Sequence, residues 1–315
     1  MDQLRAMRVF SRVIDAGGFA KAAVALDIAP AVATRLVAEL EEHLGARLIN
    51  RTTRRLALTD VGEDYLERVR NILSEVDDAE AVASIATAEP RGRLSVLAPP
   101  GFAVHQLAKH LPRFRALYPR VTIDLTVAAS VEAPDENHDV TIIVQRARPI
   151  DGAFIARRIS VAEVVLCATP EYLDLHGRPT DPRDLAEHDT LMPIPPSEQR
   201  ELSFEPAWGG GPPVLVQLKK APPLATMHSD TLYAAALAGL GIAGLPSFIA
   251  EDALMEVALE RVLPQWRMQK VTLFAAMPTR KHVPMRTRAF VDFLIATFGA
   301  DERDPWLAAA GCESC

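Results

Sequence analysis

Two groups of side chains near the N-terminus have the chemistry to hold a polyanion. Thr34 and Arg35 lie one turn into a segment that opens on Pro30, and the run Arg51-Thr52-Thr53-Arg54 follows further along the chain. The planar guanidinium of arginine can grip guanine or a phosphate with two parallel hydrogen bonds, and a threonine hydroxyl can donate to either. The sequence therefore predicts a surface that contacts the bases and the phosphates of a nucleic acid.

The spacing of apolar residues indicates the elements that must position these side chains. Apolar residues recur at three- and four-residue intervals from Leu4 to Ile14, which predicts a first helix that ends at Gly17-Gly18. A second short helix is predicted over 19–26, and Asp27-Ile28-Ala29 forms the turn before Pro30. A short helix, a tight turn, a helix that opens on proline and a basic loop are what a protein needs to lay a helix in the major groove and a wing across the DNA backbone.

The third predicted helix has one apolar face and one open face. The face expected to meet the core carries Ala33, Val37, Leu40 and Leu44. The face expected to approach the groove carries Ala31, Thr34, Arg35 and Ala38. The basic run at 51–54 could also be a solvated charged turn, but beside a helix-turn-helix it fits a phosphate footprint better.

Length and charge are consistent with a small DNA reader attached to a larger acidic part. The 315 residues exceed what one hydrophobic core usually serves, so two or three domains are expected. The net charge of −7 argues against a wholly basic protein that coats nucleic acid. Residues 1–58 nevertheless carry nine Lys/Arg and six Asp/Glu, a net of +3, which leaves −10 for the remainder.

Cysteine usage and hydropathy favour a cytoplasmic protein that does not enter a membrane. Cys167, Cys312 and Cys315 are too few and too unevenly placed for a disulfide framework. The N-terminus starts as an amphipathic helix and lacks the pattern of a secretory signal. The stretch 231–250 is nearly free of charge, but glycines and Pro246 interrupt it, so a buried helix, turn and strand are expected there instead of a membrane span.

The N-terminal motifs occur in a fixed order over residues 19–62. They are Phe19-x-Lys21-Ala22-Ala23, Thr34-Arg35, Leu40-Glu41-x-x-Leu44-Gly45-x-x-Leu48, Asn50-Arg51-Thr52-Thr53-Arg54 and Leu58-Thr59-x-x-Gly62. In spacing and residue type this segment resembles the winged helix-turn-helix of LysR-type transcriptional regulators. The resemblance implies a third helix that reads the major groove and a wing that touches the backbone or adjacent minor groove of an operator. It implies DNA-binding roles for Phe19, Lys21, Pro30, Ala31, Thr34, Arg35, Ala38, Arg51, Thr52, Thr53 and Arg54.

The segment departs from the family pattern at three positions where serine or glutamine is common, namely Gly18, Ala29 and Ala31. The missing hydroxyl at Ala29 removes a helix cap, which is typically worth about 1 kcal/mol. It also removes one possible phosphate donor. Groove contacts are therefore expected to depend more on Thr34, Arg35 and the wing.

A long connecting helix is predicted over 60–89, where Asp60 and Glu63 form a plausible capping pair and Pro90 ends the helix. The apolar residues that recur along it every three or four positions include Tyr65, Val69, Ile72 and Val76. Because charged residues lie between them, this narrow seam favours pairing with a second copy, and a dimer would place two reading helices on a two-fold operator. The alternative, a helix packed on its own domain, would need a wider apolar face.

Beyond Pro90 the pattern alternates between strands and helices, which predicts a mostly parallel sheet covered on both faces. Crossings near Ser160 and Trp266 would hinge two lobes around a cleft. The predicted domains are a reader over 1–59, a linker helix over 60–89, a two-lobed domain over 90–298 and a flexible tail over 299–315. Within the two-lobed domain, lobe I is expected at about 90–161 and 267–298, and lobe II at about 162–266.

This half carries further motifs, among them Leu111-Pro112-x-Phe114, Asp139-Val140, Ala168-x-Pro170-x-Tyr172-Leu173, Asp184-Leu185-x-x-His188 and Gly239-x-Gly241-Ile242-x-x-Leu245-Pro246. They resemble the effector-binding domain of the same family, which is built like type 2 periplasmic solute-binding proteins. The resemblance implies a two-lobed α/β domain behind an all-α reader.

Ligands in such folds sit outside the carboxyl ends of strands, near helix N-termini. The residues expected there, around a small-molecule effector, are Pro99, Pro100, Gly101, Phe102, Gln145, Arg146, Thr169, His228, Ser229 and Asp230. Family members often carry a hydroxyl in the first of these turns and an arginine in the strand after Asp139-Val140. This chain has Pro-Pro-Gly and Ile143 there, so the usual carboxylate pocket is expected to be altered.

Two motifs that could indicate other chemistry are set aside. Gly239-x-Gly241-x-x-Gly244 has the dinucleotide spacing, but a helix precedes it and a strand follows. Cys312-x-x-Cys315 has metal-ligand spacing without a second pair. We therefore expect no cofactor, no metal and no catalytic residue.

Two competing hypotheses are an α/β enzyme, for which an acid–base or nucleophile group is missing, and a solute-binding protein, for which a signal peptide is missing. Both leave the N-terminal reader unexplained. The sequence favours a dimeric or tetrameric cytoplasmic transcription factor that changes its contacts with double-stranded DNA when a small molecule closes the cleft.

Overall fold

The chain divides into two units, Met1–Gly92 and Arg93–Cys315. The computed structural model describes residues 2–52, 55–83, 89–129, 131, 133–145, 154–193, 201–208, 210–218, 220–278, 283–300 and 302–311. The first unit contains the predicted reader, and the second contains the predicted α/β domain.

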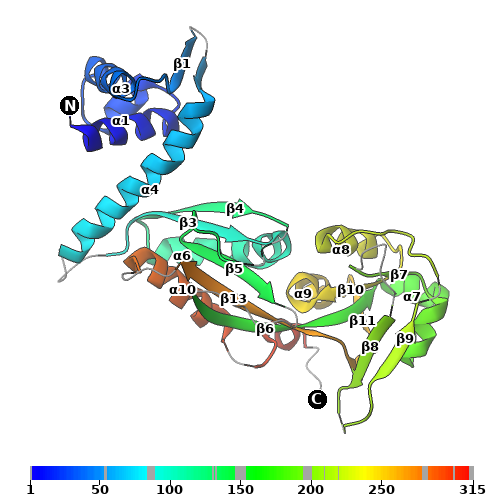
Figure 1. Cartoon of the computed structure of the whole chain (residues 1–315). Coiled ribbons are helices and arrows are strands. Elements are labelled where there is room, and N and C mark those ends of the chain that lie inside the picture. Colours follow the sequence, from blue (N-terminus) through cyan, green and yellow to red (C-terminus); the bar gives the residue numbers. More distant parts are fainter. Residues whose placement is uncertain are drawn as a thin grey trace. The chain divides into compact units, whose positions relative to one another are not determined.

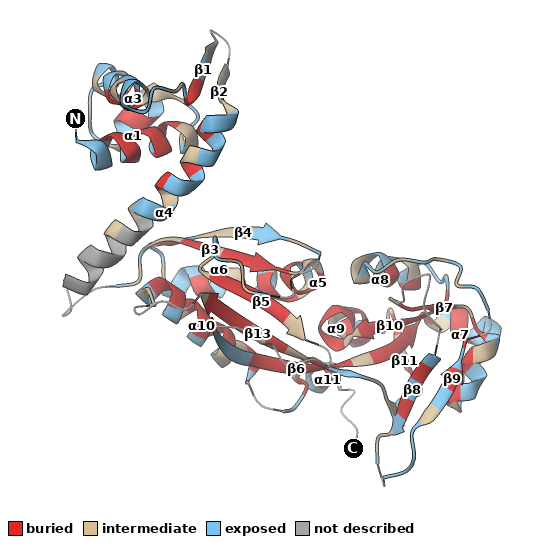
Figure 2. Cartoon of the chain, in the orientation of Figure 1, coloured by how far each residue is buried: buried red, intermediate tan, exposed pale blue. Residues whose placement is uncertain are grey.

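The first unit is a set of packed helices with a two-stranded hairpin (Figure 1). Its elements are α1 (Gln3–Asp15), α2 (Phe19–Ala25), α3 (Pro30–Leu44), β1 (Ile49–Thr52), β2 (Arg55–Leu58) and α4 (Asp60–Ala83). The predicted order of helix, turn and proline-opened helix is confirmed. Figure 2 marks the buried core in red, and its residues include Phe10, Val13, Ala22, Ala23, Ala33, Val37, Leu40, Leu48 and Ile49.

The start of α4 differs from the sequence prediction. Thr59, in place of the predicted Asp60 and Glu63 pair, caps the helix, because its hydroxyl oxygen accepts the N–H of Gly62 at 2.9 Å. Gly62 lies so close to Leu48 that an added Cβ would be 2.1 Å from the Leu48 carbonyl oxygen. No other residue type fits this close approach without moving the backbone.

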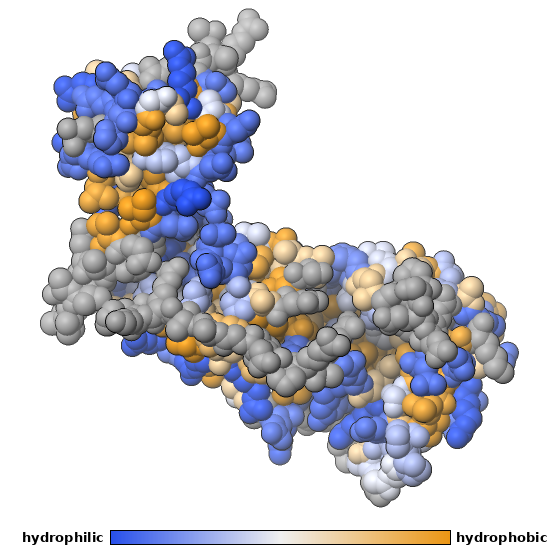
Figure 3. Space-filling model, viewed as in Figure 1, coloured by the Kyte–Doolittle hydropathy of each residue, from blue (hydrophilic) through white to orange (hydrophobic). Residues whose placement is uncertain are grey.

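The first turns of α4 pack on α1, which corrects part of the predicted dimer seam. The Tyr65 ring lies 6.0 Å from the Phe10 ring, and Val69 is 0% exposed. Tyr65 and Val69 therefore pack within their own unit, because α1 presents a matching apolar stripe. Ile72 is 42% exposed and Val76 is half-buried, so the second half of the predicted seam is less covered than the first. Figure 3 shows hydrophobic residues gathered along one side of α4.

The second unit is built on an eight-stranded sheet of mixed direction. Its strands are β3 (Gly92–Ala98), β4 (Val121–Val127), β5 (Val140–Gln145), β6 (Phe154–Ala168), β7 (Thr190–Leu191), β10 (Ile242–Pro246), β11 (Glu260–Val262) and β13 (Lys270–Pro278). The order is β4-β3-β5-β13-β6-β10-β7, and β11 also pairs with β6. A smaller sheet has the order β12-β8-β9, formed by β8 (Glu201–Pro206), β9 (Val214–Gln217) and β12 (Trp266–Arg267).

The prediction of a mostly parallel sheet is wrong at the sheet's centre. β3 and β5 run parallel, but β13 lies antiparallel to both β5 and β6. The reason is topological, since β6 carries the chain toward one end of the unit and β13 carries it back. β6 is 15 residues long, so one strand crosses much of the unit.

Helices cover this sheet, and two of the helical segments are not α-helical. They are α5 (Pro100–Phe102), a π-helical turn (Ala103–Leu107), α6 (Ala108–Leu117), α7 (Pro170–His176), a 3-10 turn (Pro182–Glu187), α8 (Ser229–Leu237), α9 (Ser247–Met255), α10 (Met285–Phe298) and α11 (Pro305–Ala309). The helical segment from α5 to α6 is interrupted by the π-helical turn, which changes the direction in which His105 and Gln106 point.

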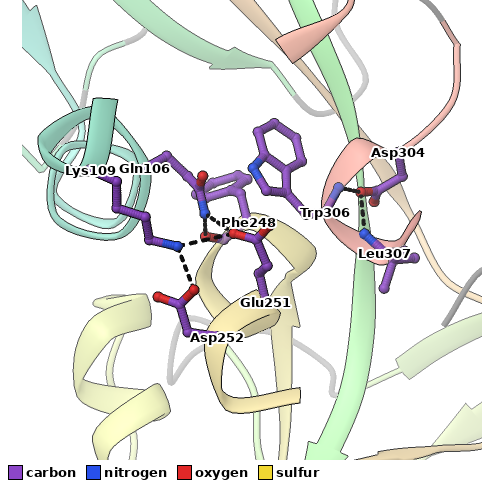
Figure 4. Close-up of polar contacts among 8 residues, drawn as sticks. All are labelled: Gln106, Lys109, Phe248, Glu251, Asp252, Asp304, Trp306 and Leu307. Carbon is purple, nitrogen blue, oxygen red and sulfur yellow. Dashed lines mark hydrogen bonds and ion pairs between the residues drawn. The ribbon is translucent and has the colours of Figure 1, made fainter. Parts of the chain in front are cut away.

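Residues 302–311 are structured, which corrects the predicted flexible tail. The Asp304 carboxylate accepts the N–H groups of Trp306 and Leu307, each at 3.0 Å (Figure 4). It also accepts the N–H of Glu163 at 2.7 Å and the hydroxyl of Ser247 at 2.6 Å. Burial raises the pKa of the Asp304 carboxyl.

Two adjacent side chains of α11 enter two different cores. Trp306, 2% exposed, packs on Phe248 and Phe298, whereas Leu307 joins a cluster with Leu232 and Leu254. No helical period is detectable in the sequence here, because the helix spans only five residues.

Candidate nucleic-acid interface and ligand site

The surface of α3 divides sharply into a buried and an open face. Ala33, Leu36, Val37 and Leu40 are buried, as expected for the core face. Pro30, Ala31, Arg35 and Ala38 are exposed, and Thr34 is half-buried. Leu44 was expected in the core but is exposed at the last turn. The side chains expected to meet DNA bases therefore lie together on the solvent side of one helix.

The Thr34 hydroxyl already has a donor role inside the helix. It donates to the carbonyl oxygen of Pro30 at 3.1 Å. A hydroxyl has one proton and two lone pairs, so in this geometry Thr34 can accept a further hydrogen bond but cannot donate one. The exocyclic amino groups of adenine and cytosine are the donors that the major groove offers. The structure thus narrows the expected role of Thr34 from donor to acceptor.

Arg35 is the exposed charged residue on the open face of α3. Its Nε lies 3.5 Å from Oε1 of Glu39, one turn later, and its side chain is 69% exposed. The pair engages Nε and leaves the two Nη groups as the fork for a bidentate contact. Glu39 therefore holds the arginine while adding a negative charge to the same face.

The wing and the edge of α2 supply the remaining predicted contacts. β1 and β2 pair antiparallel from Ile49↔Leu58 to Thr52↔Arg55. Thr53 and Arg54 lie outside the described residues, as do the side chains of Arg51 and Thr52. Lys21 is exposed on α2, whereas Phe19 is half-buried against the core of the unit, so Phe19 shapes the turn and Lys21 is the open contact.

Glu41 ties the wing to α3, a role that the sequence pattern did not indicate. Its Oε1 accepts the N–H groups of Leu48 and Ile49 at 2.9 and 3.1 Å. Thr59 holds the same loop, because its hydroxyl donates to the carbonyl oxygen of Arg47 at 2.7 Å. The motif Leu40-Glu41-x-x-Leu44-Gly45 contains this glutamate, but spacing alone does not show which backbone groups it accepts.

Two family profiles cover most of this chain. The profile described as bacterial regulatory helix-turn-helix protein, lysR family, matches residues 4–63, and the profile of the LysR substrate binding domain matches residues 87–299. The chain belongs to the LysR family of bacterial transcriptional regulators. It combines a helix-turn-helix DNA-binding domain with a two-lobed α/β regulatory domain, as the sequence predicted.

Relatives match over nearly their whole length. The HTH-type transcriptional regulator CrgA of Neisseria meningitidis is 30% identical over 93% of this chain and 96% of its own. An HTH-type transcriptional repressor of Pseudomonas aeruginosa is 32% identical, covering 95% of this chain and 93% of its own. The solved structure of CrgA has a TM-score of 0.57 over 94% of this chain and 98% of its own, at 30% identity. The full-length virulence activator AphB of Vibrio cholerae has a TM-score of 0.56 at 25% identity, over 93% and 98%.

Two of the regulator's predicted effector residues are packing residues instead. Phe102 is 0% exposed, and its ring lies edge-on to Phe248 and Phe298 at 5.9 and 5.5 Å. A Cβ on Gly101 would lie 2.6 Å from Cδ1 of Ile249. The reason is that the chain turns into α5 directly after Pro99 and presents these residues to α9. Gly101 and Phe102 are therefore corrected from ligand contacts to core residues.

Two histidines from different parts of the second unit converge on one carboxylate. Asp230 at the start of α8 lies 2.9 Å from Nε2 of His105 and 3.5 Å from Nε2 of His228. The His105 ring also stands edge-on to Tyr233 at 4.9 Å. Sequence reasoning placed Asp230 and His228 at the ligand site but missed His105, which the π-helical turn brings to them.

The other predicted effector residues are spread over several roles. Thr169 is buried and caps α7 by accepting the N–H of Tyr172 at 3.3 Å. Gln145 is half-buried at the end of β5, and Arg146 lies outside the described residues. The half-buried residues of the remaining turns are Pro99, Pro100 and Ser229.

A polar seam joins the helical segment around the π-helical turn to α9 (Figure 4). The Gln106 amide donates to the carbonyl oxygen of Phe248 at 2.8 Å and to Glu251 at 2.9 Å. Lys109 reaches Glu251 at 3.0 Å and Asp252 at 2.6 Å. These contacts connect residues from the two predicted lobes.

The described residues offer little for metal or thiol chemistry. Burial raises the pKa of the Cys167 thiol to about 12, so this cysteine stays protonated. No group of three His, Cys, Asp or Glu side chains within the described ranges is arranged to hold a metal ion. In the same ranges no helix has the length and apolar character needed to cross a membrane.

Proposed function

We propose that this regulator binds a dyad-symmetric DNA operator with α3 in the major groove and the β1–β2 wing along the backbone. The observation that carries the proposal is the division of α3 into two faces. The inner face is buried, whereas Pro30, Ala31, Arg35 and Ala38 are exposed and Thr34 is half-buried beside them. Arg35 would read guanine with its two Nη groups, and Thr34 would accept from an amino group. Because its target is chromosomal DNA, the protein would work in the cytoplasm.

The wing and α2 would supply the phosphate contacts. Arg51 and Arg54 are the wing arginines proposed for these contacts, with Thr52 and Thr53 between them, and Lys21 lies exposed on α2. Such contacts fix register without reading sequence. Each neutralised phosphate releases counterions, so these residues would set the salt dependence of binding.

A homodimer or homotetramer would align two reading heads on the two half-sites. The less covered part of the apolar seam on α4, with Ile72 exposed and Val76 half-buried, supports self-pairing, because an unpaired apolar stripe on a long helix is costly in water. The exposed Val61 and Leu4 are further apolar residues of the same unit. Substituting Ile72 with Glu would then weaken assembly and DNA binding together.

The second unit would bind a small molecule and alter DNA binding without catalysing a reaction. Its relatives carry names of transcriptional regulators, which supports a binding role over an enzymatic one. The cluster of Asp230 with His105 and His228 is the best-formed polar group among the predicted ligand residues. A ligand at 100 times its Kd would stabilise the domain by about 2.7 kcal/mol, so a thermal-shift screen of small carboxylates and aromatic compounds tests this part. If no compound raises the midpoint, the proposed ligand role fails.

In vitro selection from a random-sequence duplex library tests the DNA-binding proposal. The wild-type protein should enrich sequences with two oppositely oriented half-sites, spaced by one helical turn of about 10.5 base pairs or a multiple of it. Sedimentation of the complex should report an even number of chains. Enrichment of no sequence, or of a single unpaired site, would contradict the proposal.

A further inference from the structure

We propose that Glu41 is a positioning residue that sets the wing against the reading helix, and that it shares this task with Thr59 through the loop 47–49. The inference rests on the proposed DNA binding by α3 and the wing. It assigns to an acidic residue of α3 a part in DNA recognition that does not require contact with DNA.

The carboxylate of Glu41 accepts two consecutive backbone N–H groups with one oxygen. Oε1 lies 2.9 Å from the Leu48 nitrogen and 3.1 Å from the Ile49 nitrogen. Ile49 is the first residue of β1, so the bonded pair lies at the root of the wing. Hydrogen bonds to an ionised acceptor are stronger than neutral ones, and two of them from one rigid helix define a direction. The strand that leads into the wing therefore leaves α3 at a fixed angle.

Thr59 donates hydrogen bonds to the carbonyl groups of the same loop. Its hydroxyl donates to the Arg47 carbonyl at 2.7 Å, and its own N–H donates to the Leu48 carbonyl at 3.0 Å. The hydroxyl oxygen also accepts the Gly62 N–H at 2.9 Å and so begins α4. Four successive backbone groups, from the Arg47 carbonyl to the Ile49 N–H, are thus divided between one residue of α3 and one residue at the start of α4.

Close packing at Gly62 restricts the movement of α4 against the loop 47–49. The Cβ position of Gly62 is 2.1 Å from the Leu48 carbonyl oxygen, so α4 lies directly on the loop. Leu48 and Ile49 are themselves buried in the core of the unit. A movement of α4 must therefore carry the loop with it, and the loop carries the wing. The joint connects the linker helix to the DNA-reading surface.

Loss of the Glu41 carboxylate should release the wing from this fixed direction while α3 keeps its reading face. Phosphate contacts from the wing would then weaken, but base discrimination by Thr34 and Arg35 would persist. If two phosphate contacts of the wing are lost, the slope of log K against log salt should fall in magnitude by about 2. The affinity for DNA should then drop by roughly tenfold at low salt.

The test compares Glu41→Ala, Glu41→Gln and Thr59→Val with wild type on a dyad duplex selected by the wild-type protein and on a scrambled duplex. Binding is measured by fluorescence anisotropy at several salt concentrations, well below the unfolding midpoint of each variant. Glu41→Ala and Thr59→Val should show the flatter slope and an unchanged preference for the dyad. Glu41→Gln keeps an amide oxygen that can accept both N–H groups, so it should retain the wild-type slope.

Each result counts for or against the proposal. A wild-type slope in Glu41→Ala, or a flattened slope in Glu41→Gln, overturns the positioning role. If Glu41→Ala does not fold, Thr59→Val against the conservative Thr59→Ser carries the test, and equal slopes for those two variants overturn it. Failure of the wild type to prefer any dyad would instead refute the proposed function, so the two failures are distinguishable.

Discussion

Nε of Arg35 lies 3.5 Å from Oε1 of Glu39, so the exposed arginine of the reading helix is paired with an acid on its own face. Both side chains are solvent-exposed, and a surface pair at this spacing is worth only about 0.3–0.5 kcal/mol. Its consequence is therefore for DNA more than for stability. On the proposed DNA interface, Glu39 would orient the guanidinium and repel the phosphates that flank the groove.

Glu39→Gln should raise affinity for any duplex while leaving stability nearly unchanged. Removing one negative charge from the DNA-facing surface is expected to tighten non-specific binding by roughly threefold at low salt, with the gain lost at high salt. Electrophoretic mobility shifts of scrambled DNA across a salt series would measure it. The matched control is Glu67→Gln, the same charge change at an exposed position of α4. Equal effects of the two substitutions would show that only net charge matters.

Trp306→Ala should destabilise the regulatory domain strongly. The side chain is 2% exposed between Phe248 and Phe298, and truncation of a buried tryptophan typically costs about 3–5 kcal/mol. Urea unfolding of the full chain would report the loss. Leu175→Ala, at a position 80% exposed, should change stability by no more than about 0.5 kcal/mol. A small loss of unfolding free energy in Trp306→Ala would mean that the packing of α11 contributes little to the stability of the domain.

Acid should weaken the regulatory domain through His188. Burial, followed by the charges of His176 and Lys220, lowers the pKa of His188 below its usual 6.5. The unfolded chain then binds a proton that the folded chain does not, so stability is full above about pH 6.5 and falls as the pH drops through the folded pKa. The free energy of unfolding, measured from pH 8 to pH 5, should fall less steeply for His188→Gln than for wild type. Parallel curves would contradict the assignment.

Cys167 should be inert in the folded protein. Burial raises the pKa of its thiol to about 12, and the thiolate is the reactive form. In a Cys312→Ser, Cys315→Ser variant, iodoacetamide and cumene hydroperoxide should leave Cys167 unmodified until denaturant is added, as followed by intact mass. Rapid modification of native Cys167 would show that the core opens at this strand.

The sequence predicted the reader well because its signals are local. Proline at the start of α3, glycine at its end and apolar residues at helical spacing act within a few residues of one another. The same locality explains the failures. Tyr65 and Val69 looked like a dimer seam because the sequence does not show that α1 covers them.

The ligand site was less predictable because it depends on contacts between distant segments. Gly101 and Phe102 follow a strand as ligand residues do, yet Ile249 and Phe248 of α9 occupy the space in front of them. His105 was passed over because a regular helix would not aim it at Asp230, whereas the π-helical turn does. α11 was missed because five residues show no period.

The discrimination of Arg35→Ala between a selected and a scrambled duplex tests most directly whether α3 reads base edges through Arg35. The difference in binding free energy between a selected dyad and a scrambled duplex should shrink by about 1–3 kcal/mol per half-site, while binding to scrambled DNA persists. Arg54→Ala, as the comparison, should weaken both duplexes equally and reduce the salt slope by about 1. An Arg35→Ala protein that keeps the wild-type ratio would contradict the account.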